Sequence, residues 1–83
     1  MSERRYVLDG VEAAMRDQDV EYGPAQHHSP ARWGLILLEE VGEAAKEANE
    51  LEFREGSVNK MRYELLQVAA VCCAWLEDLD AHH

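Results

Sequence analysis

Hydrophobic residues recur at the three- and four-residue spacing of α-helices in three segments of this 83-residue chain. The pattern predicts helices over residues 3–19, from Pro30 to about residue 51, and from residue 58 to about residue 79. Strand-like alternation is missing from the sequence, and short turn-forming stretches separate the three segments. Each predicted helix follows a residue suited to cap its first turn: Ser2, Ser29 with Pro30 behind it, and Ser57. The fold class expected is therefore all-α, with antiparallel neighbours.

The third segment is apolar on more than one side. Its residues form two helical stripes, the first with Met61, Leu65, Val68, Cys72, Trp75 and Leu79, and the second with Leu66, Ala69, Cys73 and Leu76. A helix that is apolar nearly all round is enclosed by neighbours, and two other helices of this size cannot enclose it fully. We therefore expect both stripes to be core, in a four-helix-bundle type of packing completed by homo-oligomerisation.

Length and charge narrow the class of protein. The chain has room for one domain, residues 1–83. Seventeen acidic and eight basic residues give a net charge of −9, which argues against a nucleic-acid partner because phosphate binding requires a basic patch. The N-terminal residues do not resemble a signal peptide, and the longest apolar run is too short to span a bilayer. We therefore expect a cytoplasmic protein without a membrane partner.

Carboxylates are placed where two of the predicted helices can share them. Glu40 and Glu43 are three residues apart, so they are neighbours on one helical face. Glu64 and Gln67 have the same spacing on an otherwise apolar helix. Antiparallel packing of the two helices would bring these four oxygen-bearing side chains together, and such a set suits Mg²⁺.

Other interpretations of the acidic residues remain open at this stage. Glu39, Glu43, Glu47 and Glu50 fit a solvated acidic face equally well. Glu64 would also be satisfied without a metal by an ion pair with Lys60 or Lys46. A di-iron bundle is disfavoured, because the Glu-x-x-His motif of such bundles is missing.

Two short motifs carry a family resemblance. The segment "EEVGE" at residues 39–43, followed about twenty residues later by "ELLQVAAV" from Glu64, resembles the EExxE and ExxD motifs of MazG-type nucleoside triphosphate pyrophosphohydrolases. The resemblance covers residues 33–78, and it includes a tryptophan, Trp33, six residues ahead of the acidic pair. A looser likeness extends upstream to "RDQDVEYGPAQHHSP".

This resemblance implies an Mg²⁺-dependent enzyme that cleaves a nucleoside triphosphate to the monophosphate and pyrophosphate, built as a homodimer or homotetramer. Glu40, Glu43 and Glu64 match the metal-binding acids of the family. Glu39 matches the extra acid that holds or activates the attacking water, and Lys60 stands where relatives often have a phosphate-binding residue.

One position departs from the family pattern, because Gln67 stands where the second motif has its aspartate. An amide oxygen can ligate a metal, but the site then has one negative charge fewer, which weakens metal binding and water activation. The alternative is therefore a non-catalytic helical oligomer that binds a nucleotide or a protein partner. In either case the candidate substrate-binding residues, besides Lys60, are Trp33 and, in the first connection, Tyr22 and Gln26, unless that connection is only a polar loop.

Overall fold

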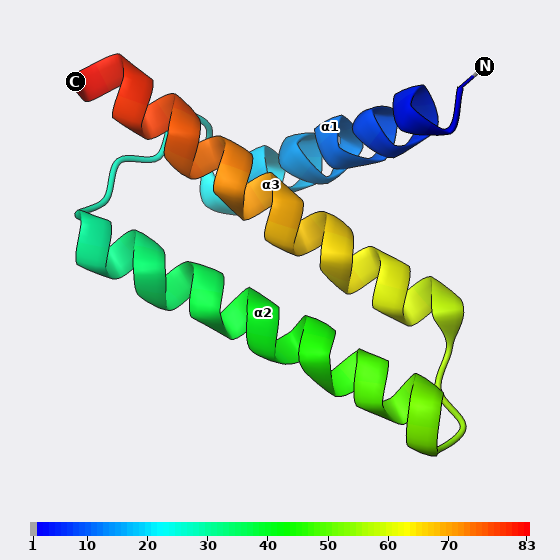
Figure 1. Ribbon diagram of the computed structural model, residues 1–83. Helices are drawn as coiled ribbons and strands as arrows, with labels where there is room; N and C mark the ends of the chain where they lie inside the picture. Colours follow the sequence, from blue (N-terminus) through cyan, green and yellow to red (C-terminus); the bar gives the residue numbers. More distant parts are fainter. Residues whose placement is uncertain (1) are drawn as a thin grey trace.

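The computed structural model describes residues 2–83 and contains three helices (Figure 1). They are α1 (Glu3–Tyr22), α2 (Pro30–Phe53) and α3 (Val58–His82), and the described residues include no strand. The all-α prediction is confirmed. Each helix runs two or three residues beyond its predicted end, because periodicity fades before a helix-breaking residue is reached. None of the helices in residues 2–83 has the length and apolar character needed to cross a membrane.

The three predicted caps form. The side-chain oxygens of Ser2, Ser29 and Ser57 each accept a hydrogen bond from the backbone N–H three residues later, at 3.1, 3.2 and 3.3 Å. Each bond satisfies one of the backbone donors that a helix start leaves without a partner. Pro30 follows Ser29 directly and occupies the first turn of α2.

Glycines shape both connections. Gly23 ends α1 with a φ of 90°, a left-handed conformation that side chains with a Cβ rarely adopt. Gly56 turns the chain from α2 into α3, and a Cβ there would lie 2.4 Å from the backbone nitrogen of Leu51. Gly56 also donates its N–H to the carbonyl of Glu50 at 3.0 Å. The close approach at Gly56 lets α3 return antiparallel along α2.

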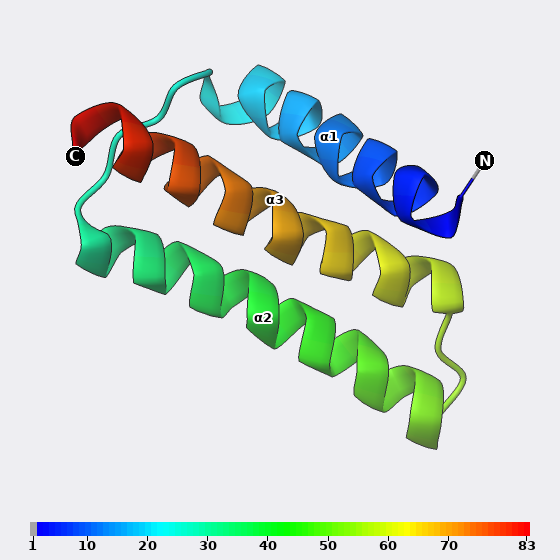
Figure 2. The same cartoon turned by 45° about the horizontal axis from the view of Figure 1, so that its top comes forward.

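The helices form an open layer with α3 in the middle. Figure 2 shows α1 along one side of α3 and α2 along the other. In the described part of the chain α1 and α2 both pack on α3 and do not contact each other. The molecule measures 42 × 34 × 20 Å, so it is flat. Three helices arranged in this way do not close a bundle.

The single chain does not bury the apolar stripes of α3 completely, and its three helices do not form the four-helix-bundle packing expected from the sequence. The apolar side chains that the structure buries are Ala14, Trp33, Ala44, Ala70 and Val71. In contrast, Leu65, Leu76 and Leu79 are 53%, 57% and 40% exposed. The reason is geometric: α1 and α2 cover opposite sides of α3 and leave the surfaces between them open to solvent.

Candidate functional site

A cavity of about 540 Å³ lies against all three helices and the first connection. It is lined by seven of the nine site residues expected from the sequence: Tyr22, Gln26, Trp33, Glu39, Glu40, Glu64 and Gln67. These residues come from three separate parts of the chain, which the antiparallel packing of α2 and α3 brings together. The cavity is therefore the candidate site.

Glu40 of α2 and Glu64 of α3 are the half-buried acids of this cavity. Burial raises the pKa of Glu40, and the negative charge of Glu64 raises it further. Burial also raises the pKa of Glu64, followed by the charges of Glu43 and Glu47. Each carboxylate thus lies in a region of low solvent access among other carboxylates, where its charged form is disfavoured.

No ion pair within the described residues neutralises these two acids. The ion pairs formed within residues 2–83 involve neither Glu64 nor Glu40, and neither Lys46 nor Lys60 takes part in one. Glu64 therefore does not form the ion pair with Lys60 or Lys46 that was one interpretation of the sequence. Carboxylate oxygens without a cationic partner are the donors that Mg²⁺ prefers. Among the described residues, however, no three of these acids lie close enough together to share a metal ion.

The remaining acids of the first motif are more exposed. Glu39 lines the cavity but is open to solvent. Glu43 is also exposed and is not part of the cavity wall, although its charge acts on both Glu40 and Glu64. Glu47, one turn further along α2, is half-buried and acts on Glu64. Glu47 does not line the cavity.

Gln67 faces the cavity but is held by a residue that the sequence did not single out. Its Oε1 accepts a hydrogen bond of 2.8 Å from Nε2 of Gln18 on α1. In the described residues it has no hydrogen bond with Glu40 or Glu64, so it does not orient either acid directly. The bond ties α1 to the acidic wall formed by α2 and α3.

A buried polar contact fixes the end of the cavity near the first connection. Trp33 is only 3% exposed, and its Nε1–H donates to Oδ2 of Asp78 at 2.8 Å. The backbone N–H of His28 donates to the same oxygen at 3.2 Å. The Trp33 bond, together with bonds from His27 and His28, holds the pKa of the Asp78 carboxyl well below its usual range, although burial acts in the opposite direction. Trp33 is therefore mainly a structural anchor of the wall.

The cation of the cavity wall is Arg32, one residue before Trp33. Lys60, to which the sequence assigned phosphate binding, is exposed and does not line the cavity. Tyr63 joins Tyr22 in the wall and adds a second aromatic ring beside the acids. Arg32 could have been found from spacing, because it lies two helical turns before Glu39 and Glu40.

Asp78 also had a signal in the sequence. It lies four turns after Glu64, and the two residues are within about 40° of each other around α3. The stripe that contains Glu64 and Gln67 thus continues through the buried Val71 to Asp78. The hydrogen-bond partners of Asp78 could not be predicted, because His27 and His28 belong to an irregular connection about fifty residues away.

Comparison of the chain with models of protein families, with curated proteins and with solved structures gives no match.

Proposed function

We propose that the 540 Å³ cavity binds a nucleoside triphosphate with Mg²⁺ and that the protein hydrolyses it to the monophosphate and pyrophosphate, as the MazG-type motifs imply. The observation that carries this proposal is the pairing of Glu40 and Glu64. These half-buried acids face the cavity from two helices, and no cation of residues 2–83 pairs with them. Retaining such a pair costs stability, which favours a functional reason for it.

The charge of the cavity makes the metal a requirement for this substrate. Four glutamates and one arginine, Arg32, line the wall. A triphosphate is itself a polyanion, so the cavity would repel it in the absence of divalent cations. When bound, Mg²⁺ would neutralise the negative charge of the acids and of the phosphates, and it would polarise the phosphate oxygens. Glu40 and Glu64, with Glu43 at the edge, are the residues that would hold it.

The chain's own side chains have the following roles in this proposal. Arg32 binds a phosphate oxygen, and the rings of Tyr22 and Tyr63 contact the base or sugar. Glu39 accepts a proton from the water that attacks the α-phosphorus. The bond from that phosphorus to the α–β bridging oxygen breaks, and its electron pair leaves with pyrophosphate.

We further propose that a second copy covers the open surfaces of α3. The chain exposes 6311 Å² of surface, whereas a compact monomer of this mass exposes about 5,000 Å². Its radius of gyration is 13.8 Å, compared with about 12 Å for a compact domain of this length. The surplus of roughly 1,300 Å² exceeds the ~800 Å² that each partner buries in an ordinary stable interface. A homodimer, or a tetramer built from dimers, accounts for it.

The second candidate is a non-catalytic oligomer that binds the nucleotide without cleaving it. The observation that favours it is Gln67, which stands at the position of the family's aspartate and is neutral. Its oxygen is already engaged by Gln18 at 2.8 Å. The metal would then be held with one charge fewer, which lowers its affinity.

Thermal melts and pyrophosphate release distinguish the two. Mg²⁺ with a triphosphate should raise the melting temperature of the wild-type protein, since a ligand that binds only the folded state stabilises it. Glu64→Gln should abolish that increment, whereas Gln67→Asp should enlarge it and raise pyrophosphate release. Glu52→Gln, an exposed acid on α2 away from the cavity, is the matched control and should behave as wild type.

The outcomes separate the proposals. Stabilisation by the nucleotide without pyrophosphate release from any of a panel of ribo- and deoxyribonucleotides would favour the non-catalytic candidate. A melting temperature that Mg²⁺ and nucleotide leave unchanged in both wild type and Gln67→Asp would overturn the metal site and, with it, the enzyme.

A further inference from the structure

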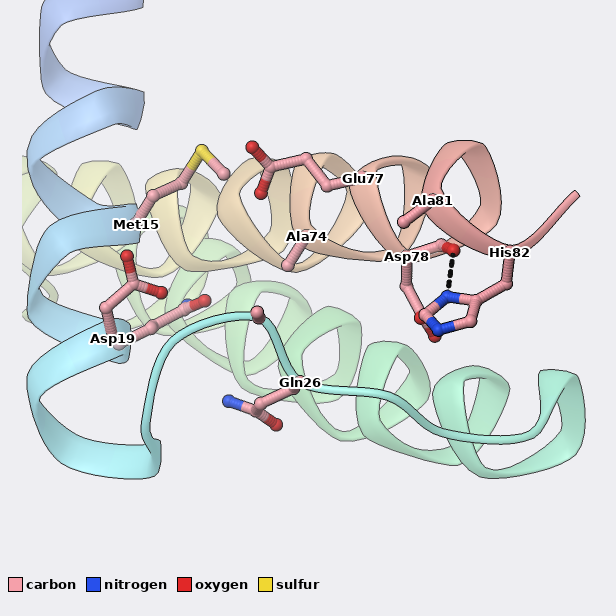
Figure 3. Close-up of a pocket in the computed structure, with 10 residues that line it drawn as sticks. Met15, Asp19, Gln26, Ala74, Glu77, Asp78, Ala81 and His82 are labelled. Atoms are coloured by element: carbon pink, nitrogen blue, oxygen red, sulfur yellow. Dashed lines mark hydrogen bonds and ion pairs between the residues drawn. The ribbon is translucent and has the colours of Figure 1, made fainter.

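Two histidines meet one carboxylate oxygen at the end of α3, away from the acidic pair. Oδ1 of Asp78 lies 2.7 Å from Nδ1 of His27 and 3.0 Å from Nδ1 of His82. His27 belongs to the connection between α1 and α2, whereas Asp78 and His82 are one turn apart in α3. Figure 3 shows the His82 ring turned back toward Asp78 at one end of a second cavity, of about 390 Å³.

The carboxylate of Asp78 is held in place from its other side. Its side chain is 5% exposed, and Oδ2 accepts from the indole N–H of Trp33 and from the backbone N–H of His28. These two donors leave Oδ1 directed at the imidazoles. A carboxylate whose second oxygen is fixed by hydrogen bonds is the usual arrangement of an oriented metal ligand.

We propose that His27, Asp78 and His82 form a binding site for a divalent transition-metal ion of the Zn²⁺ class. Two imidazole nitrogens and one carboxylate oxygen suit zinc and its neighbours, whereas Mg²⁺ prefers oxygen ligands alone. One candidate ligand atom of each residue lies within 4.8 Å of those of the other two. Three protein ligands leave a fourth position for water, and Asp78 and His82 both border the second cavity, which gives that position access to solvent.

Small movements of exposed side chains complete the geometry. Ligand atoms about 2.1 Å from a tetrahedral ion lie about 3.4 Å from one another, so both histidines must move away from Oδ1 by about half an ångström. The two imidazole rings stack with centroids 4.0 Å apart. The side chains of His27 and His82 are 63% and 49% exposed, which leaves them free to rotate.

The ion would clamp the first connection onto the end of α3. Gln26 and His28, on either side of His27, line the proposed nucleotide cavity, and the Nε2 of His28 pairs with the Gln26 side-chain oxygen at 2.8 Å. A metal at His27 therefore orders one wall of that cavity. The competing explanation is a metal-free contact in which Nδ1–H of His27 donates to Oδ1 of Asp78 and Nδ1–H of His82 donates to the backbone carbonyl of Asp78 at 3.0 Å.

Calorimetric titration of the full chain, stripped of metal, with Zn²⁺ tests the site, and the visible absorption of Co²⁺ reports its coordination. The wild type should bind one ion per chain. His27→Gln and His82→Ala should each lower the affinity at least about 100-fold, because losing even an outer partner of a ligand costs 10–100-fold. Gln at position 27 keeps an N–H donor and removes the imidazole, so it separates ligation from hydrogen bonding.

The matched controls are His28→Ala and His83→Ala, which remove neighbouring histidines outside the cluster. Both should keep wild-type affinity for Zn²⁺, and stabilisation by Mg²⁺ with a nucleotide should be unchanged in His83→Ala, whose side chain lies outside both cavities. The proposal is overturned if the wild type takes up no Zn²⁺, if His27→Gln binds as tightly as the wild type, or if the controls lose as much affinity as the cluster variants.

Discussion

At the scale of single residues, the molecule contains two carboxylates with opposite environments on one stripe of α3. Asp78 is buried and receives donors on both oxygens, so its charged form is stabilised. Glu64 is half-buried among acids, so its charged form is destabilised. The difference arises from neighbours, since both residues occupy the same face of the same helix. The charged form of Asp78 thus stabilises the fold. The charge of Glu64 destabilises the fold, and a bound cation would offset this effect.

The stability of the metal-free protein should reflect this cost. Because the pKa of Glu40 and of Glu64 is raised in the fold, the folded state binds more protons than the unfolded state just above the ordinary glutamate pKa of about 4.3. The contribution of this pair to the free energy of unfolding is therefore most favourable at low pH. It is lost as the pH rises through the raised pKa values of Glu40 and Glu64. In EDTA, the wild type should melt at a higher temperature near pH 5 than at pH 7.

Glu64→Gln gives the matching comparison. Its melting temperature in EDTA at pH 7 should exceed that of the wild type, and the gain on acidification should shrink, because one of the two interacting charges is gone. Glu52→Gln, an exposed substitution away from the cavity, should retain the wild-type slope. Equal slopes for wild type and Glu64→Gln would show that the acids do not interact in solution.

At the scale of elements, the residue at which α2 begins determines which of its side chains face the cavity. Ser29 caps the helix with Pro30 in its first turn, and the cap fixes where the helical repeat begins. Trp33 and Glu40, which are seven residues apart, then lie along one side, and Arg32 has the same spacing to Glu39. Trp33 locks this side onto α3 through Asp78, and stacks with Trp75 at 6.2 Å between ring centroids.

Binding of Mg²⁺-nucleotide should therefore depend on Arg32 and not on Lys60. Arg32→Ala should weaken nucleotide affinity about tenfold or more, since a hydrogen bond to a charged group contributes about 1.5–3 kcal/mol. Lys60→Ala removes a cation that is exposed outside the cavity and should leave affinity unchanged. Fluorescence titration with a labelled nucleotide measures both. The reverse result would restore the phosphate role that the sequence gave to Lys60.

At the scale of the whole molecule, the flat layer has little interior. Each outer helix touches the central one along a single side, so large apolar residues of α2 and α3 stay exposed, among them Leu35, Leu38, Leu65 and Leu76. Exposed apolar surface of this extent on a small domain favours the proposal that a second copy packs against it. A second layer packed on the first would turn the open side of α3 into the interior of a bundle.

Light scattering should therefore find an assembly larger than the 9.5 kDa chain at micromolar concentration. Leu65→Glu and Leu76→Glu, which place charges on the exposed stripes of α3, should reduce it to the monomer and lower its melting temperature. Val20→Glu, on a side chain of α1 that is 88% exposed, should leave the assembly intact. A wild type that scatters as a 9.5 kDa monomer would contradict the shared-core proposal.

The sequence by itself determined the helices and their beginnings. Periodicity and the serine caps are local properties, so Ser2, Ser29 and Ser57 could be assigned without knowledge of the packing. The helical repeat also placed Glu40 and Glu64 on faces that meet when α2 and α3 run antiparallel. The sequence further singled out seven of the fifteen residues that line the cavity.

Only the tertiary structure decided which of these residues are buried and what they contact. Burial depends on which sides of α3 the other two helices cover, and that choice left Leu65, Leu76 and Leu79 exposed while burying Asp78. The contacts of Gln18 with Gln67 and of His27 with Asp78 join residues about fifty positions apart. No periodic pattern encodes such pairs, because they depend on how helices dock and on the path of an irregular connection.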